Sequence, residues 1–286
     1  MPSSAVDTSS ISFTALYTGQ VWCENGLSAE AFRTPTGRLF YLAMTPLETL
    51  SDWVTGGNIR KFLLQRHHLL DHRLSQALES QGIAQVLEIA CGLSPRGWRL
   101  RQRYPHLRYV EADLPAMAAR KQHLLETLGA DHRVHRAVPI DIFASRGDTS
   151  LETVLAREFD RTQPIAVITE GLVNYFPLPR ITPFWSQLVE VLQPAGGVYL
   201  TDNYPLPARY PFRRALKGAS TLLSLAARSD VSFHFDDDTQ ARTYFEDLGF
   251  ADVQVHNPQD YLDRLPIPRV RGEPLVRVVE GWISKR

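Results

Sequence analysis

Acidic residues lie in or directly after three apolar segments that have the pattern of buried strands. Glu88 lies within VLEIA (residues 86–90), Asp113 ends RYVEAD, and Glu170 ends IAVITE. Apolar runs of this length are typical of parallel strands covered on both faces. Because the carboxyl ends of parallel strands meet at one edge of a sheet, we expect Asp113 and Glu170 to flank a common crevice. Carboxylates there can accept hydrogen bonds from ribose hydroxyls or from an ammonium group, which indicates a nucleotide-like ligand.

A turn of small residues follows the first of these strands. Residues 90–92 read Ala-Cys-Gly, and Gly92 would let backbone N–H groups approach a ligand closely. Ser94 and Pro95 predict a helix start, with the hydroxyl as N-cap and proline at the first helical position. A dinucleotide fingerprint would have three glycines, so the turn alone also fits a sharp corner that binds nothing. The acid about twenty residues downstream, Asp113, favours the binding interpretation.

The order of the expected elements predicts an α/β fold. Strands are expected at 86–89, 108–113, 134–138, 165–170, 197–204, 251–256 and 275–284, with helices at 115–128, 180–192 and 237–248. Strands that alternate with helices are typical of a doubly wound, mostly parallel sheet. The last two strands have no helix between them, which fits an antiparallel pair. We therefore predict a Rossmann-like α/β sheet with an antiparallel last strand.

The chain is expected to consist of a helical lead-in and a larger core. Residues 1–82 have apolar side chains at mixed helical spacing, and a long helix from about residue 58 to residue 81 is closed by Gly82. We expect this lead-in to cap the mouth of the sheet and to shape the substrate pocket. Residues 83–286 would form the core, with residues 205–228 inserted as a second piece of the cap.

Composition limits the classes of partner. The chain of 286 residues has 31 basic and 31 acidic side chains, so its formal charge is zero. That balance argues against a dedicated surface for nucleic acid or for an anionic membrane. No apolar run is long enough to span a bilayer, the N-terminal residues lack the order of a secretion signal, and only two cysteines occur. We predict a cytoplasmic protein, and its oligomeric state stays open.

Five motifs in sequence order resemble those of the leucine carboxyl methyltransferase family, which includes bacterial polyketide O-methyltransferases. The family patterns S-x-T-A-L, R-x-R-x-x-D, G-A-G-L-D-T-R-x-x-R-L, E-x-D-L-P and A-E-G-L-x-x-Y-L-P correspond to residues 12–16, 66–71, 90–100, 111–115 and 169–177. The chain departs from them at three positions that bear on function. His68 replaces the second arginine, Ala90 replaces the first loop glycine, and Ser94 replaces the loop aspartate.

The resemblance implies a class I methyltransferase that uses S-adenosylmethionine and releases S-adenosylhomocysteine. Such a pocket needs a cation for the methionine carboxylate, acceptors for the ammonium group and an acid for the ribose diol. Arg66 would supply the cation, Glu170 with loop carbonyls the acceptors, and Asp113 the acid, with Leu114 beside the adenine. The candidate cofactor-binding residues are Arg66, Glu88, Ala90, Gly92, Asp113, Leu114, Asp141, Ile142 and Glu170.

Asp141 and Ile142 resemble the family's Asp-Leu pair, whose aspartate contacts the adenine amino group. Each assignment has a structural alternative. Arg66 could lie along a helix surface, Asp141 could close a turn, and Asp113 could cap the helix that begins at Pro115.

The acceptor side is expected to follow the fourth and fifth strands. Asn174, Tyr175, Asn203 and Tyr204 would line it, and Asp202 is the candidate general base. A carboxylate acceptor needs no base, whereas a phenol or an alcohol benefits from one. The resemblance favours O-methylation of a small molecule or a peptide carboxylate, but N- and S-methylation fit the same cofactor half.

Three alternative interpretations apply to these residues. The substitutions at Ala90 and Ser94 would suit a catalytically silent module that binds S-adenosylmethionine or S-adenosylhomocysteine. A nicotinamide-dependent dehydrogenase is disfavoured because the three-glycine fingerprint is missing. His68 with His72, and His132 with His135, have the spacing of metal ligands, but no motif places a third ligand, so no metal is predicted.

Overall fold

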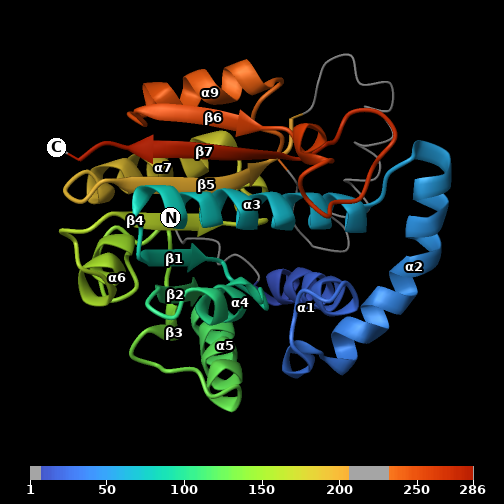
Figure 1. Cartoon of the computed structure of the whole chain (residues 1–286), viewed down its shortest axis with the longest axis horizontal. Helices are drawn as coiled ribbons and strands as arrows, with labels where there is room; N and C mark the ends of the chain where they lie inside the picture. The colour runs from blue at the N-terminus through green and yellow to red at the C-terminus, as the bar shows by residue number, and fades with distance from the viewer. Residues whose placement is uncertain (1–7, 206–231, 286) are drawn as a thin grey trace, which may run out of the picture.

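A seven-stranded sheet with helices on both faces forms the centre of the computed structural model, which describes residues 8–205 and 232–285 (Figure 1). The strands are β1 (Gln85–Ile89), β2 (Arg108–Asp113), β3 (His135–Pro139), β4 (Ile165–Thr169), β5 (Gly197–Asn203), β6 (Asp252–His256) and β7 (Arg277–Ile283), in the order β3-β2-β1-β4-β5-β7-β6. The first five are mutually parallel, and β7 runs antiparallel to β5 and β6. The predicted sheet and its antiparallel last strand are confirmed.

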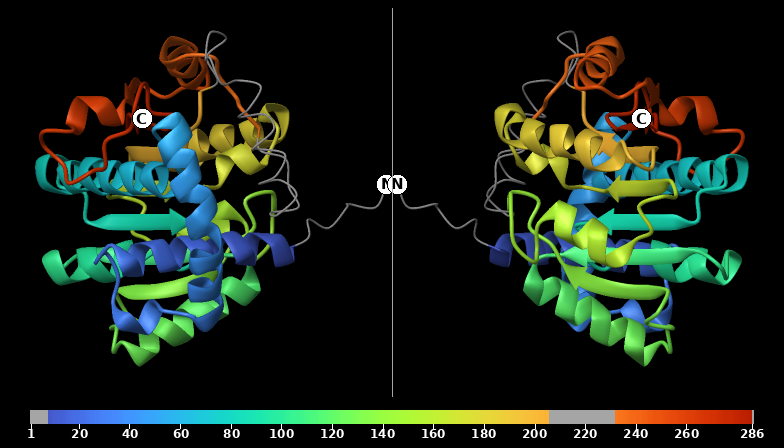
Figure 2. Two further views of the ribbon diagram at one scale, coloured as in Figure 1. Left: turned by 90° about the vertical axis from the view of Figure 1, so that its right-hand side faces the viewer. Right: turned by 90° about the vertical axis from the view of Figure 1, so that its left-hand side faces the viewer.

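The helices divide between the two faces of this sheet. They are α1 (Thr8–Glu24), α2 (Pro35–Thr55), α3 (Ile59–Gln81), α4 (Arg96–Arg103), α5 (Pro115–Thr127), α6 (Leu151–Glu158), α7 (Leu178–Leu192) and α9 (Asp238–Asp247), with short 3-10 turns η1 (Glu30–Phe32), η2 (Val173–Tyr175) and η3 (Pro258–Tyr261). One face carries α3, α4 and α5, and the other carries α6, α7 and α9 (Figures 1 and 2). The sequence did not predict α6, and α2 is one continuous helix across Pro46.

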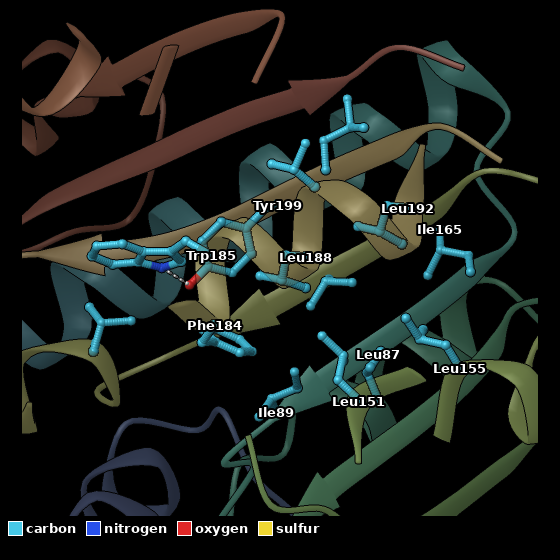
Figure 3. Close-up of a cluster of buried hydrophobic side chains, with 14 of the residues drawn as sticks. Leu87, Ile89, Leu151, Leu155, Ile165, Phe184, Trp185, Leu188, Leu192 and Tyr199 are labelled. Atoms are coloured by element: carbon cyan, nitrogen blue, oxygen red, sulfur yellow. Dashed lines mark hydrogen bonds between the residues drawn. The ribbon is translucent and has the colours of Figure 1, made fainter. Parts of the chain in front are cut away.

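Two apolar layers hold the sheet. On the α7 side, Trp185 and Phe184 pack against Tyr199 of β5, and the indole N–H of Trp185 donates to the Tyr199 hydroxyl at 3.2 Å (Figure 3). On the α3 side, Leu70 and Leu74 pack among strand residues of the same cluster. All five side chains are at most 2 % exposed, so the strand ends between these layers are held in fixed positions.

Strand alternation places the acidic residues on one face of the sheet. Val86, Ile168 and Leu200 belong to the apolar layer on the α3 side. Because side chains two positions apart in a strand share a face, Glu88, Glu170 and Asp202 also point toward α3. The carboxylates of β1, β4 and β5 therefore meet the residues of one helix layer.

The predicted helical lead-in is helical, but its parts differ in position. α3 lies across β5 and β7 and is itself a layer of the core, whereas α1 and α2 lie beyond the carboxyl ends of the parallel strands (Figure 1). α3 thus belongs to the helix layer that covers the sheet, and the division of the chain at residue 82 stays a prediction. The predicted second cap piece, residues 205–228, lies outside the described residues except for Pro205. Among the helices in the described part of the chain, none has both the length and the apolar character needed to cross a bilayer.

Candidate functional site

Arg66 joins the ends of β4 and β5 to α3. Its side chain is 8 % exposed, its Nε donates to Glu170 Oε1 at 3.0 Å, and its Nη1 donates to Asp202 Oδ2 at 3.1 Å and to the Tyr204 hydroxyl at 2.8 Å. Its Nη2 makes no hydrogen bond to any residue that the structure describes; it lies beside Gly171, where an added Cβ would be 2.8 Å away. The structure therefore brings together four residues that the sequence placed in the site or beside it, and one guanidinium edge remains for a ligand.

Glu170 is an ionised carboxylate with one acceptor position to spare. Besides Arg66, its Oε2 accepts from Arg96 Nη2 at 2.5 Å and lies 2.9 Å from His67 Nδ1. Burial alone would raise the pKa of Glu170, but its interactions with His67, Arg96 and Arg66 lower it well below its usual range. A carboxylate offers about four lone-pair positions, and three are used here. The fourth suits an ammonium hydrogen, the role predicted from the sequence.

Arg96 is the centre of a buried ion-pair network that the sequence did not reveal. Its guanidinium is fully buried and reaches Asp71 at 2.6 Å, Glu88 at 2.5 Å and Glu170. The other oxygen of Glu88 accepts from the Tyr109 hydroxyl at 2.6 Å. Since both oxygens of Glu88 are occupied and its side chain is 1 % exposed, the predicted contact of Glu88 with a cofactor would require displacing one of these partners. The only sequence signal for Arg96 was its place in the matched loop motif.

Acidification should destabilise the protein between about pH 4 and pH 2. Burial raises the pKa of Asp71, but His67, Arg96 and Arg99 outweigh it and bring it to about 2; the pKa of Glu280 is likewise lowered to about 2 against its burial, by His256 and Arg73. A depressed folded-state pKa contributes stability above the unfolded value of about 4, and this is lost as pH falls through the folded value. Urea unfolding at pH 7, 4 and 2 should show a loss of about 2–3 kcal/mol per group by pH 2.

The substitution Asp71→Asn is the control for this effect, because it should remove part of the acid sensitivity. A free energy of unfolding that stays constant from pH 4 to pH 2.5 would contradict the assignment of the ion pairs.

The glycine loop keeps its left-handed turn although its first glycine is replaced. Ala90 has φ +56° and Gly92 has φ +47°. Gly92 faces α1, since an added Cβ would lie 3.1 Å from the Cβ of Ala15. Ala15 of the S-x-T-A-L segment therefore packs against Gly92, and the approach of a ligand to this loop stays a prediction. The loop conformation is preserved in spite of the alanine, which removes one reason to regard the fold as silent.

Replacing Ala90 by glycine should stabilise the protein. A left-handed backbone costs an alanine about 1–2 kcal/mol, and the greater freedom of glycine in the unfolded chain offsets part of that gain. We expect the free energy of unfolding to rise by about 0.5–1 kcal/mol, as measured by urea denaturation. Ala112→Gly in β2, where φ is ordinary, is the control and should lower it by about 1 kcal/mol. Equal effects of the two substitutions would refute the argument from Ala90.

Asp113 fastens the glycine loop to the end of β2. Its Oδ2 accepts from the Gly92 N–H at 2.8 Å, and its Oδ1 accepts from the Leu114 N–H at 2.8 Å. Burial raises the pKa of Asp113, and these two backbone N–H groups oppose that rise. The N-cap of α5 is Leu114, and no side chain caps this helix, so the alternative in which Asp113 caps it is wrong. Helix α4 begins one residue later than predicted, at Arg96, whose N–H lies 3.3 Å from the Ser94 hydroxyl.

Asp141 and Ile142 follow β3 at the same edge of the sheet. Asp141 is exposed, and its carboxylate accepts from the Phe143 N–H at 2.9 Å, which is the turn-closing role of the alternative interpretation. Ile142 is half-buried and packs against the α7-side core. β2 and β3 are parallel neighbours, and Asp113 pairs with Pro139, two residues before Asp141. Asp141 therefore follows the strand next to that of Asp113, and its contact with the adenine stays a prediction.

Three buried polar atoms near the ends of β4 and β5 have no partner among the described residues. They are Asn174 Oδ1, Asn203 Oδ1 and His234 Nδ1. The amide nitrogen of Asn174 donates to the Ser232 carbonyl at 2.7 Å, and His234 Nε2 lies 2.8 Å from the Phe176 carbonyl. A buried polar atom without a partner costs about 1–3 kcal/mol, so such atoms are expected where a ligand completes them. The sequence predicted both asparagines but not His234, whose surroundings show no motif.

Two of the four histidines that have the spacing of metal ligands make other contacts. His72 packs edge-on against Tyr261, and His135 Nε2 lies 2.7 Å from Glu111. Within residues 8–205 and 232–285, no three His, Cys, Asp or Glu side chains form a group that could hold a metal ion. An open groove of about 730 Å³ lies elsewhere, between the second half of α3 and the β6–β7 pair, where Arg73 and Glu280 form an ion pair at 2.6 Å.

The sequence profile named "Leucine carboxyl methyltransferase" matches residues 28–184, which is more than half of the chain. The chain belongs to the leucine carboxyl methyltransferase family. The matched part includes Arg66, Arg96, Asp113 and Glu170 and ends before Asp202. The residues that the family resemblance assigned to the cofactor are therefore in the matched region, and the fifth-strand residues are not.

Similar proteins agree with this family. A protein of Mycobacterium sp. (strain KMS), provisionally named an S-adenosyl-L-methionine-dependent methyltransferase, is 34% identical over 54% of this chain and 49% of its own length. The match thus spans about half the length of that relative. A structure from Thermobifida fusca YX, provisionally described as a methyltransferase, has a TM-score of 0.65 at 14% identity and covers 97% of this chain and 94% of its own. A DUF574 family protein from Streptomyces avermitilis has a TM-score of 0.64 at 12% identity over 96% and 97%. These structures share the fold.

Proposed function

We propose that this protein is an S-adenosylmethionine-dependent methyltransferase that methylates an oxygen of a small molecule or a carboxylate. The observation that carries the proposal is Arg66 Nη2, which has no hydrogen-bond partner among the described residues and lies beside the ionised Glu170, at the carboxyl ends of parallel strands in a chain of this family. The names of the mycobacterial relatives support the cofactor and the reaction class.

The charge of the candidate site suits this cofactor. In and around the ion-pair network, five largely buried carboxylates outnumber three guanidinium groups. The carboxylates are those of Asp71, Glu88, Asp113, Glu170 and Asp202, and the guanidinium groups are those of Arg66, Arg96 and Arg99. S-adenosylmethionine carries one carboxylate against an ammonium and a sulfonium, so its net charge is positive. An excess of buried acid favours such a ligand over a nucleotide phosphate.

The roles of the binding residues follow from the atoms that remain free. Arg66 Nη2 would hold the methionine carboxylate, and the fourth acceptor position of Glu170 would take an ammonium hydrogen. Each oxygen of Asp113 accepts one backbone N–H and keeps one lone pair, which matches the two hydroxyls of a ribose. Leu114 would lie beside the adenine, with Asp141 and Ile142 as the outer candidates and Ala90 and Gly92 in the loop.

The chain's own contribution to the reaction is positioning. When bound, the cofactor supplies a methyl group on a sulfonium, an electrophile that already has a good leaving group. Fixed side chains align the acceptor and exclude water. The unpartnered oxygens of Asn174 and Asn203 can accept from O–H or N–H groups of an acceptor, with Tyr175 and Tyr204 beside them. This favours a hydroxyl-bearing molecule over a thiol.

Asp202 is the base predicted from the sequence, and a pH profile can test that role against His234. Asp202 Oδ1 accepts from the Gly171 N–H at 2.7 Å and Oδ2 from Arg66, so its geometry favours holding Arg66 over taking a proton. Asp202→Asn should leave the low-pH limb of the kcat profile in place and raise the Kd for S-adenosylhomocysteine several-fold. Loss of that limb would make Asp202 the base.

The matching variant is His234→Gln. Burial lowers the pKa of His234, so the ring is neutral at physiological pH and Nδ1 is free to accept. If the low-pH limb disappears in His234→Gln and persists in Asp202→Asn, His234 is the base.

Isothermal titration calorimetry with S-adenosylhomocysteine tests the proposal directly. We expect saturable binding of one molecule per chain, followed by methylated product in mass spectrometry with a panel of hydroxylated and carboxylic acceptors. Absence of binding would refute the methyltransferase proposal. Binding with no product from any oxygen, nitrogen or sulfur acceptor would instead identify a silent binding module.

A further inference from the structure

Large apolar side chains are exposed along one face of α2. Six of them are between 56% and 75% exposed: Leu39, Leu42, Leu47, Leu50, Trp53 and Val54. Their spacing in a helix of 3.6 residues per turn places all six within one broad stripe. We call these six residues the α2 stripe. Elsewhere in the described part of the chain, the large exposed hydrophobic residue is Phe143, at 38%.

The opposite face of α2 is fixed, so the stripe cannot turn inward. Glu48 is buried there; it accepts from the Tyr17 hydroxyl at 2.6 Å and forms an ion pair with Arg60. The Arg60 guanidinium also lies 3.5 Å above the ring of Tyr41. Rolling α2 to bury its leucines would bring Glu48 out and leave Arg60 without its partner. The stripe is thus a stable surface feature of the fold.

The size of the stripe is that of an interface. Applied to whole-residue surfaces of about 150–250 Å², the exposed fractions amount to roughly 700 Å² of surface on these six residues. The largest apolar patch on a typical monomer is about 300–600 Å². Two such stripes placed face to face would bury about 1,400 Å², which lies within the range of stable protein–protein interfaces.

The chemistry of the stripe favours a second copy of the same chain. The charged residues of α2 all lie outside the stripe, and they are Arg38, Glu48 and Asp52. Glu48 is buried, and Asp52 pairs with Lys61 at 2.6 Å. The stripe therefore lacks the basic residues that an anionic membrane attracts and the charges that a charged peptide would need. An apolar face without like charges can pair with itself across a twofold axis.

We propose that two copies of this chain associate through α2, stripe against stripe. α2 runs along the outer edge of the fold, away from the sheet, and faces the viewer in the left view of Figure 2. A partner placed there meets α2 before any strand of the sheet. The association does not depend on the proposed catalytic function.

Sedimentation velocity from 1 to 100 µM tests the proposal. The unmodified chain should be dimeric at the higher concentrations, and Leu50→Glu, near the middle of the stripe, should raise the dimer Kd at least 100-fold because two buried like charges would face each other. Gln102→Glu adds the same charge on an exposed residue of α4 and should leave the Kd unchanged. Because Leu50 is 58% exposed, the Leu50→Glu variant should fold as a monomer, and its thermal melting curve checks this.

Several outcomes would overturn the proposal. A chain that is monomeric at 100 µM, or a dimer that Leu50→Glu does not weaken, contradicts it. A monomer that floats with phosphatidylcholine vesicles would show a membrane as the occupant. The quenching of Trp53 fluorescence by acrylamide is obtained as the difference between the unmodified chain and Trp53→Phe. If the chain is a monomer and Trp53 is not quenched, another segment of the same chain covers the stripe.

Discussion

Replacing Arg96 by leucine is expected to lower the free energy of unfolding by about 3–5 kcal/mol. The fully buried guanidinium joins Asp71, Glu88 and Glu170, and its removal would leave buried carboxylates without their cation. Breaking a buried ion pair from one side has an effect of this size, because the remaining charge stays out of water. Urea denaturation followed by circular dichroism at pH 7 measures it.

Arg99→Leu is the matched control. Arg99 lies three residues further along α4 and also pairs with Asp71, but its side chain is 28% exposed. Solvent can replace much of that interaction, so we expect a loss of about 1 kcal/mol. If the two substitutions cost the same, burial does not decide the strength of the network and our account of Arg96 fails.

Replacing Arg66 by lysine should weaken binding of S-adenosylhomocysteine about 30- to 100-fold. Lysine keeps the charge that Glu170 and Asp202 require, but it lacks the planar fork that would hold a carboxylate at Nη2 while the other nitrogens stay engaged. Isothermal titration calorimetry measures the Kd, and urea denaturation of the same sample measures how much stability is lost. The change in affinity should exceed the change expected from partial unfolding.

Arg73→Lys controls for this substitution. Arg73 lies seven residues after Arg66 on the same helix, and its Nε donates at 2.6 Å to Glu280, in the middle of β7. This variant should lose stability and keep the Kd of the unmodified chain. Equal weakening of binding in both variants would show that the ligand responds to the packing of α3 and not to Arg66.

The fold was predictable where local patterns were strong. Seven apolar segments with turn residues between them gave the sheet, and the missing helix between the last two strands gave their antiparallel pairing. α6 was missed because it is only eight residues long, although Ser150 caps it with a hydrogen bond from the Thr153 N–H. α2 continues across Pro46, a usual helix breaker, which is tolerated here at an exposed position.

The candidate site was predictable in its acids and less so in its cations. Asp113 and Glu170 are strand-end residues, so their edge of the sheet followed from the strand pattern. Which arginine becomes buried depends on packing between helices, and nothing in the local sequence separates Arg96 from its exposed neighbours. The left-handed backbone of Ala90 was equally hidden, because alanine does not signal that conformation.

Helix α3 is attached to the sheet at two places, through Arg66 near one end and Arg73 about 10 Å further along its axis. A rod fixed at two separated points can neither pivot nor slide by a turn without losing both attachments. We therefore expect α3 to keep its position while a ligand binds. Any opening to the proposed site would then come from the segments beyond the carboxyl ends of the parallel strands, among them α1 and α2.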